Sequence, residues 1–333
     1  MSFEGMPGHD LINVDRDLEP VAAVRDQEAA ERRRAYPEIV GVGPPEFGCA
    51  EQAGGAWRIL SLGALEPGEA RVDLSFHLRD IAGDHDPAVR DDMLRLADAL
   101  DRTEFERAGV ERAGSERAES ERAGSSAAAG GASDRNECAV GPLRFRIVRV
   151  LGFARFGADG PEPARVTDGE DGPLRGFAID PAAPVGPADA ALRLELLGLV
   201  PAEGTVPERL RREAVTAIRA HPGVVLLPPE FTVLEDRDGQ WRPVTGGIGP
   251  QDARDSLAHY FRVLLPKAGP GDCGPPPSPG ELAEYAEAAD RIDADGGVEF
   301  VACGRRFRIV HVIRMIRVGP DGPEPARPSD EVP

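Results

Sequence analysis

The chain has 333 residues, of which 58 are acidic and 39 basic, so its formal net charge is −19. This charge opposes nonspecific binding to nucleic acid or to an anionic membrane surface, and no apolar run is long enough for a transmembrane helix. The N-terminal residues lack the apolar core of a secretory signal, and the four cysteines form no Cys-x-x-Cys pair. We therefore expect a cytoplasmic protein with reduced thiols and with no bound metal or cofactor.

The predicted elements occur twice in the same order. An amphipathic helix is expected at 18–37 and again at 206–222, and each ends before a proline, which disfavours helical geometry in the residue that precedes it. A Pro-Pro-Glu-Phe segment and a short hairpin follow each helix. The hairpin turn is expected at Gly54-Gly55 in the first half and at Asp238-Gly239 in the second, because these residues accept positive φ angles.

Two more helices are predicted in each half, from apolar residues spaced three and four positions apart. Their inward-facing residues, in chain order, are Leu74, His77, Leu78 and Ile81; Val89, Met93, Leu96 and Leu100; Leu257, Tyr260, Phe261 and Leu264; and Leu282, Tyr285, Ala289 and Ile292. Ser278 is the expected N-cap of the last helix, where Glu281 completes a capping box. Residues 104–135 contain a five-residue repeat that fits neither helix nor strand, so we expect a disordered low-complexity insertion.

Each half closes with a second hairpin, whose long last strand is rich in β-branched residues and arginine. The strand runs into an extended Pro-rich segment, which we call the strap. The sequence therefore predicts an α+β protein of two tandem homologous domains, each built as helix–hairpin–helix–helix–hairpin with a C-terminal strap. Their expected limits are 18–168 and 206–330. A disordered tail at 1–17 precedes them, and a Pro/Ala-rich linker at 169–205 joins them, with one short apolar helix that should dock onto one domain.

The two halves match most closely where they end. Residues 144–168 (RFRIVRVLGFARFGADGPEPARVTD) and 306–330 (RFRIVHVIRMIRVGPDGPEPARPSD) are identical at 16 of 25 positions without a gap. Upstream, the two Pro-Pro-Glu-Phe segments correspond, as do Trp57 and Trp241. We interpret the chain as a tandem duplication whose copies pack as an internal pseudo-dimer.

The closing motif and the Pro-Pro-Glu-Phe…Trp segment resemble an uncharacterised bacterial family of GC-rich genomes, catalogued only as a domain of unknown function. The composition is typical of such genomes, because Lys267 is the only lysine and almost all basic residues are arginine. The resemblance implies no activity, cofactor or catalytic residue.

Candidate catalytic groups are few. None of the six histidines is shared between the halves, and the chain has neither a Gly-x-Ser-x-Gly elbow nor a Gly-rich phosphate loop. Asp84-His85-Asp86 could be a metal-ligand cluster, but an N-cap at the start of the third helix is the favoured interpretation. The sequence therefore leans away from an enzyme, with no catalytic or metal-binding residue assigned.

Arginine is the most informative polar feature of the two closing hairpins. The candidate anion- or partner-binding residues are Arg144, Arg146, Arg155, Arg306, Arg308 and Arg317. Two interpretations stay open, because these guanidinium groups could bind an external anion or pair with acidic side chains of the same chain. Among the latter, the straps offer Glu162, Glu324, Asp168 and Asp330.

The favoured function is a non-catalytic interaction or regulatory protein that binds an acidic protein or an anionic ligand through its arginine hairpins. One alternative is an enzyme acting on an anionic small molecule in an Arg-lined pocket, with Glu46 and Glu230 or Asp84 and His85 within reach of the arginines. The other alternative is a nucleic-acid-binding protein, which the net charge disfavours. No membrane partner is expected.

Overall fold

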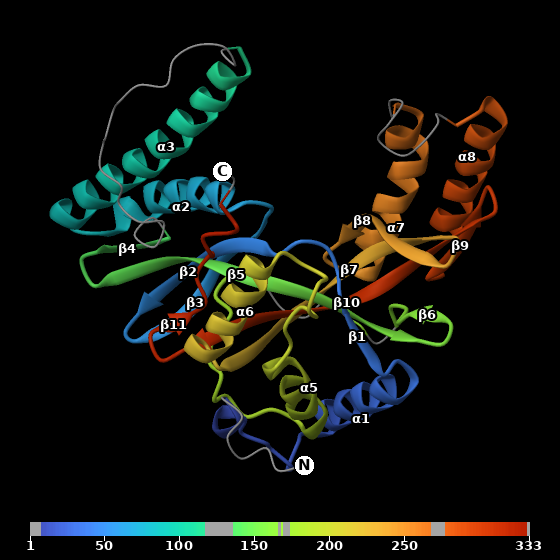
Figure 1. The fold of residues 1–333 in the computed structure, drawn as a ribbon, viewed down its shortest axis with the longest axis horizontal. Coiled ribbons are helices and arrows are strands. Elements are labelled where there is room, and N and C mark those ends of the chain that lie inside the picture. Colours follow the sequence, from blue (N-terminus) through green and yellow to red (C-terminus); the bar gives the residue numbers. More distant parts are fainter. Residues whose placement is uncertain (1–7, 117–135, 166–167, 169–173, 268–276, 332–333) are drawn as a thin grey trace.

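The computed structural model describes residues 8–116, 136–165, 168, 174–267 and 277–331, with the side chains of 103–116 excepted. Helices and strands are mixed along the whole chain, and the strands form one curled antiparallel sheet (Figure 1). The α+β prediction is therefore confirmed.

The first half of the chain follows the predicted order of elements. Its elements are α1 (Pro20–Ala35), β1 (Glu38–Gly41), β2 (Glu46–Ala53), β3 (Ala56–Ala64), α2 (Pro67–Ile81), η2 (Ala82–Asp84), α3 (Pro87–Glu116), β4 (Glu137–Val140), β5 (Leu143–Gly157) and β6 (Gly160–Pro161). The turn between β2 and β3 has positive φ at Gly54 and Gly55, as predicted. Helix α3 extends through the first part of the predicted insertion, to Glu116, and residues 117–135 lie outside the described residues.

The second half repeats this order after the short helix of the linker. Its elements are α5 (Pro187–Leu197), α6 (Glu208–Ala220), β7 (Gly223–Arg237), β8 (Gln240–Gly247), α7 (Pro250–His259), η3 (Tyr260–Leu264), η4 (Leu265–Lys267), α8 (Pro279–Ala294), β9 (Glu299–Ala302), β10 (Arg305–Gly319) and β11 (Gly322–Pro323). Asp238 and Gly239 have the expected positive φ, and Ser278 and Glu281 form the expected capping box.

One predicted core position is wrong. Leu264 was expected to face inward but is 50 % exposed, because the chain leaves the α-helical repeat after His259 and forms a single π-helical turn. A π turn inserts an extra residue and rotates the following side chains. Leu265, one position later, is 3 % exposed and takes the place in the core.

The long strands β5 and β10 lie side by side at the centre of the sheet, in the order β3-β2-β5-β10-β7-β8. In this pairing Gly152 lies opposite Arg314. These two residues are also equivalent in the match between the closing segments. Outward from this central pair, β2 and then β3 follow on one side, and their counterparts β7 and then β8 follow on the other.

Each strap crosses to the long strand of the other half. The Ala164 amide donates to the Ile309 carbonyl at 2.8 Å, and the Ala326 amide donates to the Ile147 carbonyl at 3.1 Å. In the sequence match, Ala164 is equivalent to Ala326, and Ile147 is equivalent to Ile309. The described parts of the two straps are thus exchanged between the halves.

The helices cover one face of the curled sheet. The odd-numbered side chains of β5 and β10 lie on this face. Phe145 of β5 packs against α2 and α3, and Phe307 of β10 packs against α7 and α8. Near the centre, Leu196 and Leu197 of the linker pack against Phe153 of β5 and against neighbouring residues of β10. The linker helix therefore docks where strands of both halves meet, rather than on one half as expected.

The opposite face holds the even-numbered side chains. Val148 and Ile316 pack there with Trp57 of β3 and with Ile179 of the linker.

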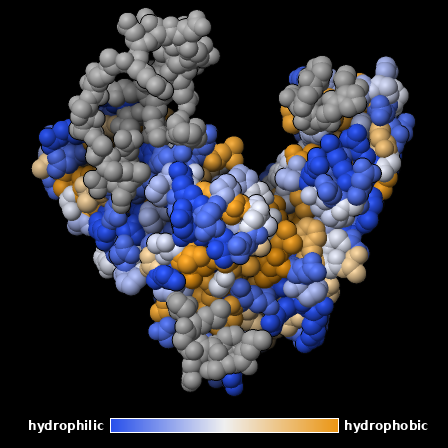
Figure 2. Space-filling model, viewed as in Figure 1, coloured by the Kyte–Doolittle hydropathy of each residue, from blue (hydrophilic) through white to orange (hydrophobic). Residues whose placement is uncertain are grey.

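From one side, the helix pairs α2–α3 and α7–α8 stand out as two arms, and apolar residues gather over the region between them (Figure 2). The described part of the predicted tail includes a 3₁₀ turn, η1 (His9–Leu11), and Val14 bridges Val185 of the linker.

Candidate functional site

The six arginines predicted to bind an anion lie in three different environments. Arg144 and Arg306 are half-exposed, with their guanidinium groups over the rings of Trp57 and Trp241 at 5.7 and 5.6 Å. Arg144 pairs with Glu137, whereas the carboxylates nearest to Arg306 are 3.9 and 4.0 Å away. These two residues are the accessible part of the predicted arginine surface.

Arg146 and Arg308 hold the exchanged straps. Arg146 Nη1 donates to the Pro323 carbonyl at 2.8 Å, and Arg308 Nη1 donates to the Pro161 carbonyl at 2.6 Å. Their Nη2 atoms lie 3.1 and 3.4 Å from the carboxylates of Asp321 and Asp159, and both residues are 1–2 % exposed. These guanidinium groups are therefore paired within the chain.

Arg155 and Arg317 extend from equivalent positions of β5 and β10 and are buried at 4 % and 2 % exposure. Arg155 donates to Glu195 of α5 at 2.8 Å. Arg317 donates to the carbonyls of Leu196 and Leu197, both at 3.0 Å. Each of the two arginines also lines a cavity, and the two cavities are described next.

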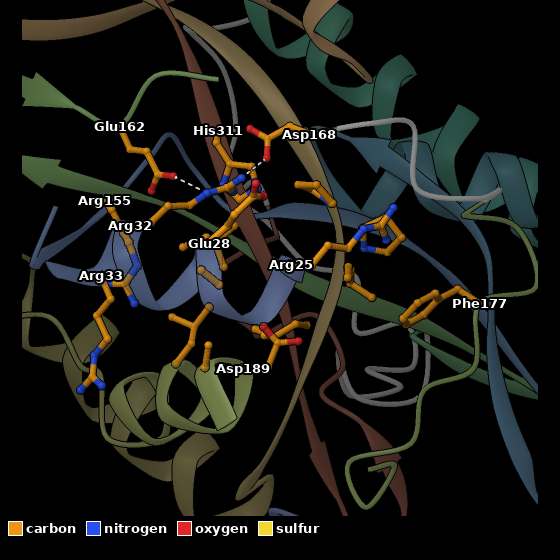
Figure 3. Close-up of a pocket in the computed structure, with 18 residues that line it drawn as sticks. Arg25, Glu28, Arg32, Arg33, Arg155, Glu162, Asp168, Phe177, Asp189 and His311 are labelled. Carbon is orange, nitrogen blue, oxygen red and sulfur yellow. Dashed lines mark hydrogen bonds and ion pairs between the residues drawn. The ribbon is translucent and has the colours of Figure 1, made fainter. Parts of the chain in front are cut away.

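The first, which we call the α1 cavity, has a volume of about 520 Å³ and lies between α1, α5, β7 and β10. It is lined by Arg25, Glu28, Ala29, Arg32, Arg33, Arg155, Glu162, Asp168, Phe177, Ala188, Asp189, Leu192, Leu226, Leu227, Pro228, Pro229, His311 and Ile313. Arg32 of α1 reaches both carboxylates of the strap, with Nε 3.2 Å from Glu162 Oε1 and Nη2 bonded to Asp168 (Figure 3).

Burial perturbs the titration of two groups in the α1 cavity. It raises the pKa of Glu162 to about 7, although the charges of Arg32 and Arg165 oppose the change. It also lowers the pKa of His311 to about 4, so this imidazole is neutral at pH 7. His311 packs edge-on against Phe231 and adds no charge to the cavity.

The second, which we call the α6 cavity, has a volume of about 290 Å³. It is lined by Ile39, Gly41, Arg149, Leu151, Phe153, Leu199, Val200, Pro201, Ala214, Arg317 and Arg327. Among the described residues that line it there is no acidic side chain. Three guanidinium groups therefore face a space whose remaining wall is apolar or backbone.

Each arginine of the α6 cavity has some protein partners, but not enough carboxylates are present for all three. Arg149 Nε is 2.9 Å from Asp330, and Arg327 Nε is 2.6 Å from Glu324. In the part of the chain that the structure describes, Arg317 is held by backbone carbonyls alone, with Leu199 as a third acceptor at 3.4 Å. Three positive charges are thus matched by two negative ones.

The excess charge is reflected in the pKa values. The pKa of Arg317 is lowered to about 10, chiefly by burial. The charge of Glu324 opposes this change, and the charges of Arg327 and Arg149 add to it. The pKa of Arg149 is lowered by burial and then by Arg327. Both arginines stay charged at neutral pH. Within the described residues, no hydrogen bond is formed by the Nη groups of Arg149 and Arg327.

The two cavities are built from equivalent positions of the two halves. The matched pairs are Ala29 and Ala214, Gly41 and Leu226, Arg149 and His311, Leu151 and Ile313, and Arg155 and Arg317. The important differences are His311 in place of Arg149, and Arg32 in the place that Ala217 occupies in α6. One arginine pairs with the strap aspartate in each case, but it comes from the helix in one cavity and from the strand in the other.

Sequence reasoning missed Arg32, Arg149 and Arg327. It selected arginines that both hairpins share, and therefore passed over Arg149, whose equivalent is a histidine. The signal was present in the same match, where a position that changes from arginine to histidine inside an otherwise identical motif marks a local change of charge.

Among the described residues, the other sequence candidates lie outside the linings of the two cavities. Arg314 brings Glu46 and Glu230 together at 3.8 and 3.1 Å, as the enzyme hypothesis required of an arginine, but neither glutamate lines either cavity. Asp86 accepts hydrogen bonds from the Ala88 and Val89 amides, so it caps α3 as favoured. In the described part of the chain, no cluster of His, Cys, Asp or Glu side chains is suited to a metal ion.

Two of the described thiols are poorly suited to act as nucleophiles. Cys49, Cys138 and Cys303 are free, and Cys273 lies outside the described residues. Burial raises the pKa of Cys49 and of Cys138 to about 12, so both remain protonated and unreactive at neutral pH.

A family model covers residues 19–333, which is nearly the whole chain. The chain belongs to the family of unknown function DUF5954. The match spans both halves of the DUF5954 sheet and both cavities. Neither a curated protein nor a solved structure matches this DUF5954 chain. None of the helices formed by its described residues has the length and apolarity needed to cross a bilayer.

Proposed function

We propose that this DUF5954 protein is a non-catalytic binding protein for an anionic ligand, and that the ligand binds in the α6 cavity. The observation that carries the proposal is the unmatched charge of Arg149, Arg317 and Arg327. A buried guanidinium group that lacks a counter-ion is unfavourable, and a bound anion restores the balance. Arg317 is one of the arginines predicted from the sequence, and Arg149 lies on the other long hairpin strand.

The cavity favours a small monoanion with an apolar body. Arg149 and Arg327 each offer a planar pair of Nη groups, which suits the two oxygens of a carboxylate or phosphate. Leu151, Phe153 and Val200 supply an apolar wall. A cavity of about 290 Å³ lies at the small end of the range for ligand sites, so we expect a compact acid rather than a nucleotide or an acidic protein.

We also propose that the two halves are a tandem duplication packed as an internal pseudo-dimer. The central pairing of Gly152 with Arg314 and the reciprocal exchange of straps support this proposal. A closed two-fold contact of this kind is the common arrangement of homodimers. The preference for arginine over lysine supports an origin in a GC-rich bacterial genome, and the free cysteines support a cytoplasmic location.

Calorimetric titration of the full-length protein tests the ligand site. The probes are benzoate, which combines one carboxylate with an apolar ring, and benzyl alcohol, which keeps the ring without the charge. We expect saturable binding of one benzoate, and no binding of benzyl alcohol at the same concentrations.

Arg327→Gln is the informative variant, because within the described residues the Arg327 side chain bonds one group, the carboxylate of Glu324 in the same strap. Loss of a charge-assisted pair of hydrogen bonds should weaken benzoate binding by about tenfold or more. Arg165→Gln changes the equivalent residue of the other half and is the matched control. Absence of benzoate binding, or equal weakening by both variants, would exclude the α6 cavity as the anion site.

A further inference from the structure

The two strands that end the sheet order are covered differently. β3 lies at one end and β8 at the other, and they are equivalent in the two halves. The linker pairs with the outer edge of β3, whereas no described residue forms a backbone bond with the outer edge of β8. We propose that the outer edge of β8 binds an extended peptide segment of a partner protein, in which apolar side chains flank an acidic one. This inference goes beyond the anion site in the α6 cavity and rests on other residues.

Residues 174–179 of the linker show how such a segment binds in the first half. They lie beside β3, and Ala178 forms an antiparallel bridge with Arg58. Three backbone hydrogen bonds hold the segment, and these run from the Gly176 amide to the Ile59 carbonyl at 2.7 Å, from the Ile59 amide to the Phe177 carbonyl at 2.9 Å, and from the Ile179 amide to the Trp57 carbonyl at 2.9 Å. The edge of this hairpin therefore accepts an added strand.

The linker segment also covers an apolar face of the first half. Leu174, Phe177 and Ile179 pack in one cluster with Trp57 and Ile59, which are both buried. The added strand therefore contributes apolar burial as well as backbone hydrogen bonds, and both are needed for a short segment to bind.

The equivalent face of the second half is more exposed. Val40 is equivalent to Val225 in the sequence match, yet Val40 is 43 % exposed and Val225 is 2 % exposed. Trp241 is half-buried and Pro243 is exposed, whereas their equivalents in β3 are both buried. A sheet edge beside a partly exposed apolar face is suited to the addition of a strand.

The residues of β8 limit how a strand can be added there. Pro243 occupies the place of Ile59 and has no amide hydrogen, so one of the three hydrogen bonds of the first half cannot form. In the same register, the carbonyls of Trp241 and Pro243 can still accept. A partner segment must therefore donate two amides, and its side chains must supply much of the binding energy.

Two arginines give the site a preference for negative charge. Arg242 stands where the first half has the arginine that faces Ala178. It is exposed and forms no ion pair with a described residue. Arg306 lies over the ring of Trp241, and its nearest carboxylates are 3.9 and 4.0 Å away. An acidic residue at the place of Ala178 would lie opposite Arg242, while its two neighbours would point to the apolar face.

The experiment uses a labelled hexapeptide and full-length protein. The probe LRGFEI is the linker sequence 174–179 with Ala178→Glu, and its binding is followed by fluorescence anisotropy. LRGFKI reverses the charge of the probe, and LRGSES replaces its last two apolar side chains. We expect saturable binding of LRGFEI, binding about fivefold weaker for LRGFKI, and binding at least about tenfold weaker for LRGSES.

Charge reversal at the proposed site is the decisive variant. Arg242→Glu changes an exposed side chain, and it should make LRGFKI bind more tightly than LRGFEI. Arg58→Glu makes the same change at the equivalent exposed position of β3, whose edge the linker already covers, and should leave both affinities unchanged. No saturable binding of LRGFEI, equal binding of LRGSES, or an unchanged preference in Arg242→Glu would overturn the proposal. A preference that Arg58→Glu reverses instead would also overturn it.

Discussion

The α1 and α6 cavities occupy equivalent places in the two halves and yet differ in charge. The α6 cavity has three arginines in its lining and no acid among the described residues there, whereas the α1 cavity has arginines and carboxylates in equal number. The backbone framework is alike, so the difference arises from a few side chains. The same scaffold therefore encloses two cavities whose linings differ in charge.

The pairing of the strap aspartates shows how the difference arises. Asp168 is paired with Arg32 of α1, and Asp330 is paired with Arg149 of β5. The same ion pair is made by a guanidinium group from a helix in one half and from a strand in the other. Because Arg32 pairs with Asp168 in the first half, the strand position holds a neutral histidine, His311, in the α1 cavity.

The largest expected effect concerns Arg155 and Arg317, the buried arginines at equivalent positions of β5 and β10. Arg317→Ala removes the buried guanidinium group that donates to the carbonyls of Leu196, Leu197 and Leu199, of which Leu196 keeps a bond from the Leu199 amide. We therefore expect a loss of about 4 kcal/mol in the free energy of unfolding. Arg155→Ala removes one ion pair to the partly exposed Glu195 and should cost about half as much. Urea unfolding of both variants measures the difference, and a larger loss for Arg155→Ala would contradict this view of the two cavities.

The next effect is a dependence of stability on pH that comes from Glu162. Because its pKa is raised in the folded state, its contribution to stability is complete below about pH 4.5 and is lost as the pH rises through about 7. A shift of this size corresponds to on the order of 3 kcal/mol. Wild type should therefore lose more stability than Glu162→Gln between pH 4.5 and pH 8.

His311 acts in the opposite direction. Its lowered pKa favours folding above about pH 6.5, and this contribution is lost as the pH falls toward 4. The histidine is present in both wild type and Glu162→Gln, so its effect cancels in the comparison. Parallel stability curves for the two proteins, measured by urea unfolding across this range, would refute the assignment to Glu162.

The smallest effect tests whether Arg32 and Arg149 have the same role, which is to pair with the aspartate of a strap. Arg149→His should destabilise the protein because the Asp330 carboxylate loses its charged partner and keeps the Arg327 amide. Adding Ala217→Arg places an arginine where α1 has Arg32, and should restore about 1 kcal/mol of the loss. A double-mutant cycle measures this coupling, and a coupling of zero would mean that the two helix positions are not equivalent.

Much of the fold follows from local patterns in the sequence. Helix periodicity, the Asp238-Gly239 turn and the Ser278 cap each depend on neighbouring residues, and each was predicted correctly. Leu264 was not, because the π turn before it changes the spacing that periodicity assumes. Local spacing fails where the helical repeat itself changes.

The site was less predictable, because it depends on contacts between distant segments. The arginine-rich strands were recognised, but the sequence could not show that Arg146 and Arg308 hold straps of the opposite half. It also could not show that Arg327 of one strap meets Arg149 of the other half's strand. Such excess charge is visible only after the sheet has brought the segments together.

The position of a bound anion tests the central claim most directly. Crystals of the protein soaked with 4-bromobenzoate would reveal the bromine by its anomalous scattering. We predict a bromine in the α6 cavity, with the carboxylate on Arg149 and Arg327 and the ring toward Leu151 and Phe153. A bromine in the α1 cavity instead, or an α6 cavity that stays empty at saturating ligand, would contradict the account.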